Sequence, residues 1–393
     1  MKAVNGRAFA ERFALNPGSY SWLLGAGASA NSGIPTGFQM IQDFRARLFA
    51  SESGISLREI DVADPVWQAR IDRHHELRAK LPARGDPTEY ARAFEALHPS
   101  PEDRRLYIRN RVSKGQPSLG HKVLGSLLAS RRTPCVFTTN FDTLIEDAAT
   151  VAVQFVPAGD RTKVTLAAID NADRAEICLR DGEWPLVVKL HGDYQSIELK
   201  NTDEELKCQD GKLRLVLSHA MHRFGLVVAG YSGRDDSVMR ALADVLRGPV
   251  CYPKGIYWLC ADPTSVMPAV NAFLQQAELA HVEVHFITGT TFDELLGDIA
   301  DVAELPPTLV THIFGDRKAD ETAQVPLQRA AVLPAPVLRL TALPVVVMPT
   351  VARRINLTAS PGIADVRQQI RDSNVWAVVA QAGAPRSMAV FGN

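Results

Sequence analysis

The chain has 393 residues, with 43 lysines and arginines against 44 aspartates and glutamates. This balance leaves no overall positive field for non-specific nucleic-acid binding, so no direct contact with nucleic acid is expected. No run reaches the roughly 20 apolar residues of a membrane span, and Arg7, Glu11 and Arg12 interrupt any signal-peptide core. The five scattered cysteines form no Cys-x-x-Cys pair, which argues against a zinc ribbon and favours a reduced, cytoplasmic protein.

Short apolar runs that end in Gly, Asn, Ser or Asp recur along the chain, which is typical of buried parallel strands. The predicted strands are 20–24, 135–138, 186–190, 226–229, 256–260 and 282–287. Helical patterns lie at 119–130, 143–151, 213–223, 236–247, 266–280 and 292–302. Because strand and helix alternate, the sequence predicts an α/β fold with a doubly wound parallel sheet and helices on both faces.

Two stretches interrupt this alternation. Residues from about 40 to 117 are charged and helical in pattern, and they exceed what a crossover between strands needs. We therefore predict a helical insertion within a domain of residues 1–304. The insertion could cover a ligand, form an oligomer contact or be a solvated decoration.

The second stretch, residues 305–393, is predicted to be a proline- and arginine-containing appendage or linker. Residues 322–363 contain no acidic side chain, and they carry four arginines and six prolines. A helix at 363–371 and strands at 375–380 and 388–391 are expected within it. The last of these runs into Gly392 and could open a further nucleotide loop.

The first predicted strand enters a glycine-rich turn made of Gly25, Ala26, Gly27, Ala28 and Ser29. Glycine allows close approach of a ligand, and the N-terminus of a following helix favours an anion, so the turn predicts a pyrophosphate loop. It matches neither the full G-x-G-x-x-G fingerprint nor the Walker pattern. Tight packing of a strand-to-helix turn is therefore the alternative interpretation.

Polar residues and glycines follow three further strands. They are Thr139, Asn140, Phe141 and Asp142, then His191 and Gly192, and then Gly230, Tyr231, Ser232 and Asp235. Because carboxyl ends of parallel strands meet at one edge, these residues are expected to line one crevice. Histidine, with an ordinary pKa near ~6.5, suits a general base. Asp142 could instead cap the helix predicted from residue 143.

These motifs resemble the sirtuin family, and more closely its bacterial branch of NAD-consuming anti-phage defence proteins. The resemblance covers about residues 15–300. It rests on the Gly25 loop with Ser32-Gly33-Ile34-Pro35, on Thr139-Asn140-Phe141-Asp142, on Leu190-His191-Gly192, and on Gly230-Tyr231-Ser232 with Asp235. Deacylating sirtuins carry glutamine in place of Thr139 and a four-cysteine zinc module that these cysteines cannot build.

The resemblance implies a Rossmann-like sirtuin fold and an NAD hydrolase that releases nicotinamide and ADP-ribose, with NAD as substrate and no metal. Asn140 would orient water and ribose, Asp142 would contact the carboxamide region, and His191 would act as general base. The remaining NAD-binding residues would be Gly25, Ala26, Gly27, Ala28, Ser29, Ile34, Pro35, Thr139, Phe141, Gly192, Gly230, Ser232 and Asp235. Thr36 and Phe38 could close over the nicotinamide.

Two other functions remain open at this point, an NAD-dependent protein deacylase and a non-catalytic NAD or nucleotide sensor coupled to a partner. An NAD hydrolase must be silent until it is needed, because uncontrolled NAD loss kills its host. We therefore expect a homo-oligomer or a regulatory defence partner, contacted through the insertion or the appendage.

Overall fold

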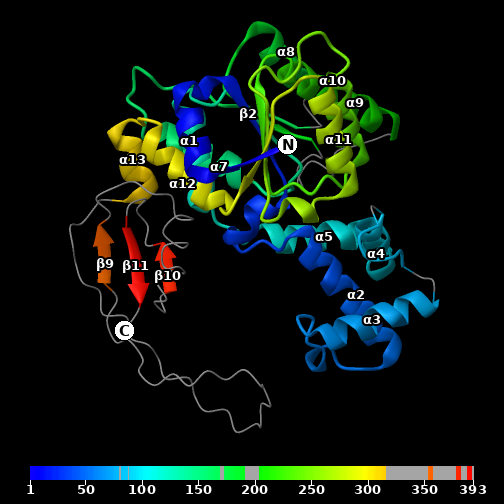
Figure 1. Ribbon diagram of the computed structural model, residues 1–393. Helices are drawn as coiled ribbons and strands as arrows, with labels where there is room; N and C mark the ends of the chain where they lie inside the picture. Colours follow the sequence, from blue (N-terminus) through cyan, green and yellow to red (C-terminus); the bar gives the residue numbers. More distant parts are fainter. Residues whose placement is uncertain are drawn as a thin grey trace. The chain divides into compact units, whose positions relative to one another are not determined.

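The computed structural model describes residues 1–78, 81–86, 88–168, 172–190 and 203–315, and three later strands. The chain divides into two compact units, Met1–Pro306 and Pro307–Asn393 (Figure 1). The division lies beside the boundary expected at residue 304. The catalytic role assigned to the first segment stays a prediction.

An eight-stranded sheet forms the centre of the first unit, and every pair of neighbouring strands in it is parallel. Its order is β1-β8-β7-β6-β2-β3-β5-β4. The strands are β1 (Lys2–Asn5), β2 (Tyr20–Leu24), β3 (Cys135–Thr138), β4 (Thr165–Ala167), β5 (Leu186–Lys189), β6 (Gly225–Ala229), β7 (Ile256–Leu259) and β8 (Val284–Thr288). The predicted doubly wound parallel sheet is thus confirmed.

Two of these strands, β1 and β4, were not predicted. Both lie at the sheet's edges and are short, and β1 is mostly exposed. By contrast, every residue of β2, β3, β5 and β6 is buried, and such strands carry continuous apolar runs.

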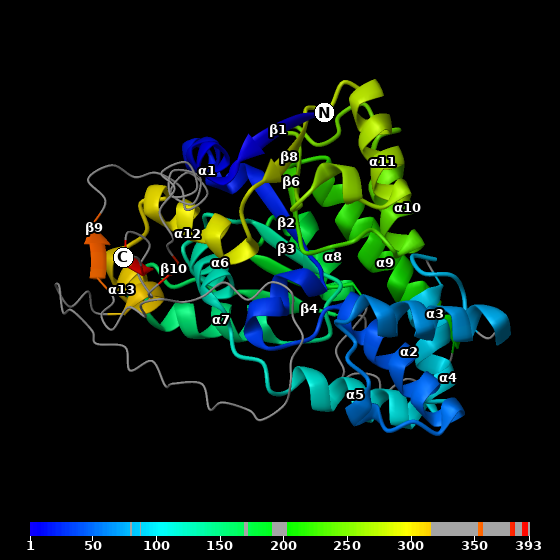
Figure 2. The ribbon, with the colours of Figure 1, turned by 60° about the horizontal axis from the view of Figure 1, so that its bottom comes forward.

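Helices cover the two faces of the sheet as separate layers (Figure 2). One layer contains α1 (Gly6–Leu15), α6 (Leu119–Ala129), α7 (Leu144–Gln154) and α12 (Phe292–Val302). The other contains α8 (Ala172–Asp181), α9 (Asp203–Met221), α10 (Asp236–Val245) and α11 (Pro268–Leu279). Helices α1 and α8 were not predicted, and α9 begins ten residues earlier than the pattern indicated, at Asp203 instead of 213.

The stretch expected to be a helical insertion is helical. It consists of α2 (Gly37–Ser53), a 3₁₀ turn (Leu57–Glu59), α3 (Pro65–Arg78), α4 (Glu89–Leu97) and α5 (Pro101–Val112). Helices α2, α4 and α5 share an apolar core in which the rings of Phe44 and Phe94 stack with centroids 4.9 Å apart. Helix α3 packs against α2 in a second apolar cluster. Buried Arg45 joins α2 to α4 through an ion pair with Glu89 at 3.0 Å. The insertion is therefore a folded subdomain with its own interior.

The second unit begins with α13 (Pro307–Phe314). Three later strands, β9 (Arg353–Asn356), β10 (Val378–Gln381) and β11 (Ser387–Phe391), form an antiparallel sheet in the order β10-β11-β9. The expectation that β11 opens a further nucleotide loop stays a prediction. The expected helix at 363–371 lies outside the described residues. Within those residues, no helix combines the length and apolarity required to cross a membrane.

Candidate active site

The candidate site lies where the strand order reverses, between β2 and β6. In the sheet, β3, β5 and β4 follow one another on one side of β2, and β6, β7 and β8 follow one another on the other side. Such a reversal opens a crevice at the carboxyl ends of the strands, which is where ligands bind in this class of fold. The loops after Leu24 and Ala229 meet at this point.

The glycines of the two loops pack backbone against backbone. The amide of Gly25 donates to the carbonyl oxygen of Ala229 at 3.0 Å, and that of Gly27 donates to the carbonyl oxygen of Gly230 at 2.9 Å. A Cβ on Gly25 would lie 2.5 Å from the Cα of Tyr231, and one on Gly27 would lie 2.8 Å from the Cα of Gly230. Close packing, the alternative interpretation of the turn, therefore accounts for both glycines. Their contact with a ligand stays a prediction.

The prediction that an α-helix begins directly after the glycine loop is wrong. Residues Ala26–Ser32 form a 3₁₀ helix, which Gly33 ends with a φ of +80°. Regular α-helix begins only at Gly37, where Thr36 and Gln39 form a reciprocal capping box. Pro35 disfavours helical backbone at the residue before it, so the small residues of the loop cannot continue into α2.

Two adjoining hollows open along the crevice. The larger, of about 410 Å³, is lined by Ala26, Gly27, Thr36, Gly37, Phe38, Tyr90, Ala91, Thr139, Gly230, Tyr231, Ser232, Arg234 and Asp235. The smaller, of about 150 Å³, is lined by Ala26, Ile34, Pro35, Gly37, Met40, Tyr90, Ile108, Arg111, Val112, Thr139, Asn140, Phe141 and Asp142. Most of the predicted site residues thus come together, and the insertion supplies part of the wall through Tyr90, Ile108 and Arg111.

A chain of hydrogen bonds connects the glycine loop to the end of β3. The amide nitrogen Nδ2 of Asn140 donates to Ser29 Oγ at 3.0 Å and to the carbonyl oxygen of Gly25 at 3.2 Å. Ser29 Oγ in turn donates to Asp142 Oδ2 at 2.8 Å. Ser29 is buried and absent from the walls of both hollows. It therefore acts as a strut between two predicted catalytic residues.

The orientation of the Asn140 amide follows from these contacts. A backbone carbonyl can only accept, so the side chain must turn Nδ2 toward Gly25 and Oδ1 away from it. Oδ1 is buried and has no hydrogen-bond partner in the described part of the chain. An unpaired buried acceptor costs about 1–3 kcal/mol, so the approach of a donor to Oδ1 would be favourable.

Asp142 combines the two roles considered for it. Its Oδ1 accepts from the amide of Leu144 at 3.2 Å, at the start of α7, while Oδ2 accepts from Ser29. The contact with Leu144 is the one that the capping interpretation predicts, and Asp142 also lines the smaller hollow. Its contact with the carboxamide region stays a prediction.

Lys189 and Glu146 form an ion pair next to the loop that carries Asn140 and Asp142. Neither residue was predicted to belong to the site. Lys189, the last residue of β5, donates to the carbonyl oxygen of Asp142 at 2.6 Å and pairs with Glu146 Oε1 at 2.9 Å. Burial raises the pKa of Glu146, and Lys189 opposes this rise. A lysine within an apolar strand was the available signal.

A second network, centred on buried Asp293, connects the glycine loop to α6 and α12. Asp293 accepts from Asn31 Nδ2 at 2.7 Å, from Ser118 Oγ at 2.6 Å and from the Gly120 amide at 2.7 Å. His121 contacts Ser118 at 2.8 Å, and burial lowers its pKa although the carboxylates of Asp142 and Asp293 oppose this. His121 is thus mainly neutral at pH 7. Sequence spacing carried no signal for this network.

The remaining predicted residues divide into three groups. Asp235 lines the larger hollow and also caps α10 by accepting from the amides of Ser237 and Val238. Ala28 is buried without lining either hollow. His191 and Gly192 lie outside the described residues. In the described ranges, no group of three or more His, Cys, Asp and Glu side chains is arranged to hold a metal ion.

Comparison with known proteins finds one matching family. Residues 134–287, which include Asn140, Asp142 and Gly230, match the SIR2-like domain. Among solved structures, one from work titled "Structural Basis for the Mechanism and Regulation of Sir2 Enzymes" is 14% identical, covers 76% of this chain and 97% of its own, and has a TM-score of 0.35. A Sir2 homologue in complex with NAD is 17% identical, covers 75% and 95%, and has a TM-score of 0.36. No curated protein matches the chain.

Proposed function

We propose that the protein hydrolyses NAD to nicotinamide and ADP-ribose, as an effector of bacterial anti-phage defence. The observation that carries the chemistry is the Asn140 side chain. Its Nδ2 is held by Gly25 and Ser29, and its Oδ1 is a buried acceptor with no hydrogen-bond partner among the described residues, in a side chain that lines the smaller hollow. The match of residues 134–287 to the SIR2-like domain supports the same assignment.

The proposed reaction breaks the bond between the anomeric carbon of ribose and the nicotinamide nitrogen. The bonding electrons pass to the pyridinium nitrogen, which leaves as neutral nicotinamide. Water oxygen bonds to the anomeric carbon, and one proton is released. Asn140 Oδ1 would accept a hydrogen bond from this water or from a ribose hydroxyl. An acceptor held in place needs little reorganisation when positive charge develops on the sugar.

The two hollows suit the two ends of the substrate. Asn140 and Asp142 line the smaller one, where the nicotinamide ribose would lie, while Gly230, Ser232 and Asp235 line the larger one, where the adenosine would lie. Ser29 and the Lys189–Glu146 pair would keep Asn140 and Asp142 in position. His191 is proposed as the general base on the resemblance of Leu190-His191-Gly192.

The defence role and its control are also proposed. They rest on the resemblance of Gly230-Tyr231-Ser232 with Asp235 to the defence branch. A homo-oligomer or a regulatory partner would contact the insertion, where Val66, Leu77 and Leu106 expose apolar side chains. Replacing these three by serine should release nicotinamide formation from control or change the mass of the assembly. A constitutively active monomer in the wild type would contradict this part.

Nicotinamide release from NAD, followed by chromatography, tests the chemistry. Asn140→Ala should reduce release at least about 100-fold, as expected for loss of a positioned polar group at the reacting centre. Asn110→Ala, which truncates an exposed asparagine on α5, is the matched control and should retain the wild-type rate. Release that requires an acyl-lysine peptide would favour a deacylase. Saturable NAD binding without release would favour a sensor.

A further inference from the structure

A second cavity lies at the amino ends of the central strands, whereas the candidate site lies at their carboxyl ends. It has a volume of about 580 Å³, larger than either hollow at the carboxyl edge. Pro134, Thr165 and Trp184 line it at the amino ends of β3, β4 and β5. At about 3.3 Å per residue, the four residues of β3 separate it from the end of that strand by roughly 10–13 Å. The two places are therefore distinct.

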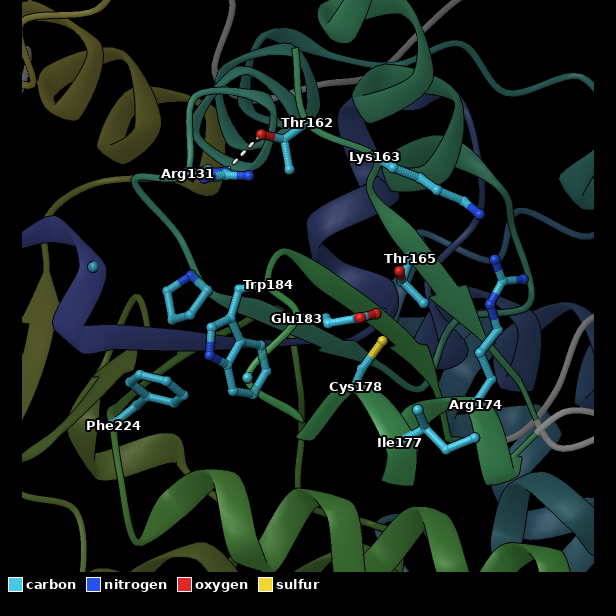
Figure 3. A pocket seen from close by; sticks show the side chains of 13 residues that line it. Arg131, Thr162, Lys163, Thr165, Arg174, Ile177, Cys178, Glu183, Trp184 and Phe224 are labelled. Atoms are coloured by element: carbon cyan, nitrogen blue, oxygen red, sulfur yellow. Dashed lines mark hydrogen bonds between the residues drawn. The ribbon is translucent and has the colours of Figure 1, made fainter. Parts of the chain in front are cut away.

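Cationic side chains outnumber carboxylates in this cavity. Arg131, Lys163 and Arg174 line it together with a single acidic residue, Glu183. Figure 3 shows the side chains of Lys163 and Arg174 directed to the same end of the cavity. In the described part of the chain, none of the three cations forms an ion pair. Three cations against one carboxylate give the lining of the cavity an excess of positive charge, which attracts an anion.

An aromatic wall stands at the other end of the cavity. The rings of Trp184 and Phe224 meet edge to face with centroids 5.3 Å apart (Figure 3). Trp184 is partly buried and borders the cavity. A rigid indole beside a cavity offers a surface on which a flat heterocycle can stack. The cavity thus presents an aromatic end and a cationic end.

Arg131 is held at the wall of the cavity by a contact of its own side chain. It follows the last turn of α6 with a φ of 58°, in the left-handed region where a glycine usually ends a helix. The chain keeps a long cation there instead. Its Nε donates to the hydroxyl of buried Thr162 at 2.6 Å, which fixes the guanidinium at the cavity.

We propose that this cavity, defined by Arg131, Lys163, Arg174, Glu183 and Trp184, binds a phosphorylated nucleoside as a second ligand. The base stacks on Trp184, and the phosphate lies between Lys163 and Arg174. Arg131 and Glu183 offer a donor and an acceptor to the groups between them. This site needs neither Asn140 nor His191 and does not depend on the proposed hydrolase activity.

Titration of the full chain with AMP, followed by tryptophan fluorescence, tests the proposal. AMP should quench a component of the emission that is missing from Trp184→Phe. Arg174→Glu and Lys163→Glu should each weaken this quenching at least about tenfold, because each reverses a charge next to the phosphate. Arg247→Glu, which reverses an exposed arginine two residues after the end of α10, should leave the affinity unchanged. Thermal unfolding checks that each variant is folded.

Two further probes separate the parts of the ligand. Adenosine, which lacks the phosphate, and ribose 5-phosphate, which lacks the base, should each bind at least about tenfold more weakly than AMP. Ribose 5-phosphate binding as tightly as AMP would overturn the stacking on Trp184. AMP binding that gives no Trp184-dependent signal, or that is unaffected by both charge reversals, would overturn the site itself. If the AMP affinity of Arg174→Glu and Lys163→Glu falls no further than that of the control Arg247→Glu, the site is also overturned.

Discussion

Substitution of Ser29 by alanine is the sharpest test of the hydrogen-bond chain in the candidate site. The hydroxyl is buried, donates to Asp142 Oδ2 at 2.8 Å and accepts from Asn140 Nδ2 at 3.0 Å. A hydrogen bond to a charged group contributes about 1.5–3 kcal/mol and a neutral one about 0.5–1.5 kcal/mol. Ser29→Ala should therefore lower the free energy of unfolding by about 2–4 kcal/mol.

The matched control lies three residues away on the same 3₁₀ helix. Ser32 is also buried, and its Oγ has no hydrogen-bond partner in the described ranges. Ser32→Ala should leave stability unchanged or raise it slightly, because it removes an unpaired polar atom. Urea unfolding measures both variants. Equal stability of Ser29→Ala and Ser32→Ala would refute the reasoning.

The same variants report on catalysis. Without Ser29, the side-chain nitrogen Nδ2 of Asn140 keeps its hydrogen bond to the carbonyl oxygen of Gly25, at 3.2 Å, and loses the one to Ser29. The side chain, and with it Oδ1, should therefore be held less firmly. Nicotinamide release per folded molecule should fall by about 10- to 100-fold in Ser29→Ala and remain normal in Ser32→Ala. An unchanged rate in a destabilised Ser29→Ala protein would show that the strut matters for folding alone.

Two further substitutions probe the packing around the site. Gly230→Ala should lower the free energy of unfolding by about 2–5 kcal/mol, because Gly230 has a φ of +68° and its Cβ would lie 2.1 Å from the Ala28 amide nitrogen. Gly33→Ala is the control: its φ is +80°, but its Cβ would meet open space, so the loss should be only about 1–2 kcal/mol. Urea unfolding measures both. Equal losses would contradict the close-packing account. Lys189→Met should cost about 3–5 kcal/mol near pH 7 by leaving the Glu146 carboxylate unpaired. Burial raises the pKa of Glu146 above 4.5, and loss of Lys189 raises it further, so the folded state takes up the proton first and the loss should shrink as pH falls from 7 toward 5. A loss that is constant over this range would contradict the pairing.

The fold could be predicted because its central strands are buried on both faces. Such strands need an apolar residue at every position, so β2 and β3 stood out as continuous runs with the bounds later observed. The edge strands β1 and β4 gave no such signal, since β1 contains no buried residue and the middle residue of β4 is exposed. The prediction of a helix directly after the glycine loop was wrong for a local reason, because the small residues of the loop and Pro35 favour a 3₁₀ helix there.

The sequence by itself determined that the residues after β2, β3 and β6 meet at the carboxyl ends of the strands, because parallel strands place these ends together. Ser29 contacts Asn140 and Asp142 as that rule requires. Only the tertiary structure decided why Gly25 and Gly27 are glycines, since the backbone that excludes a Cβ belongs to Gly230 and its neighbour, some 200 residues later. The partners of Lys189 and Asp293 were decided in the same way. Contacts across the fold depend on how strands and helices pack in space, and no local pattern in the chain records them.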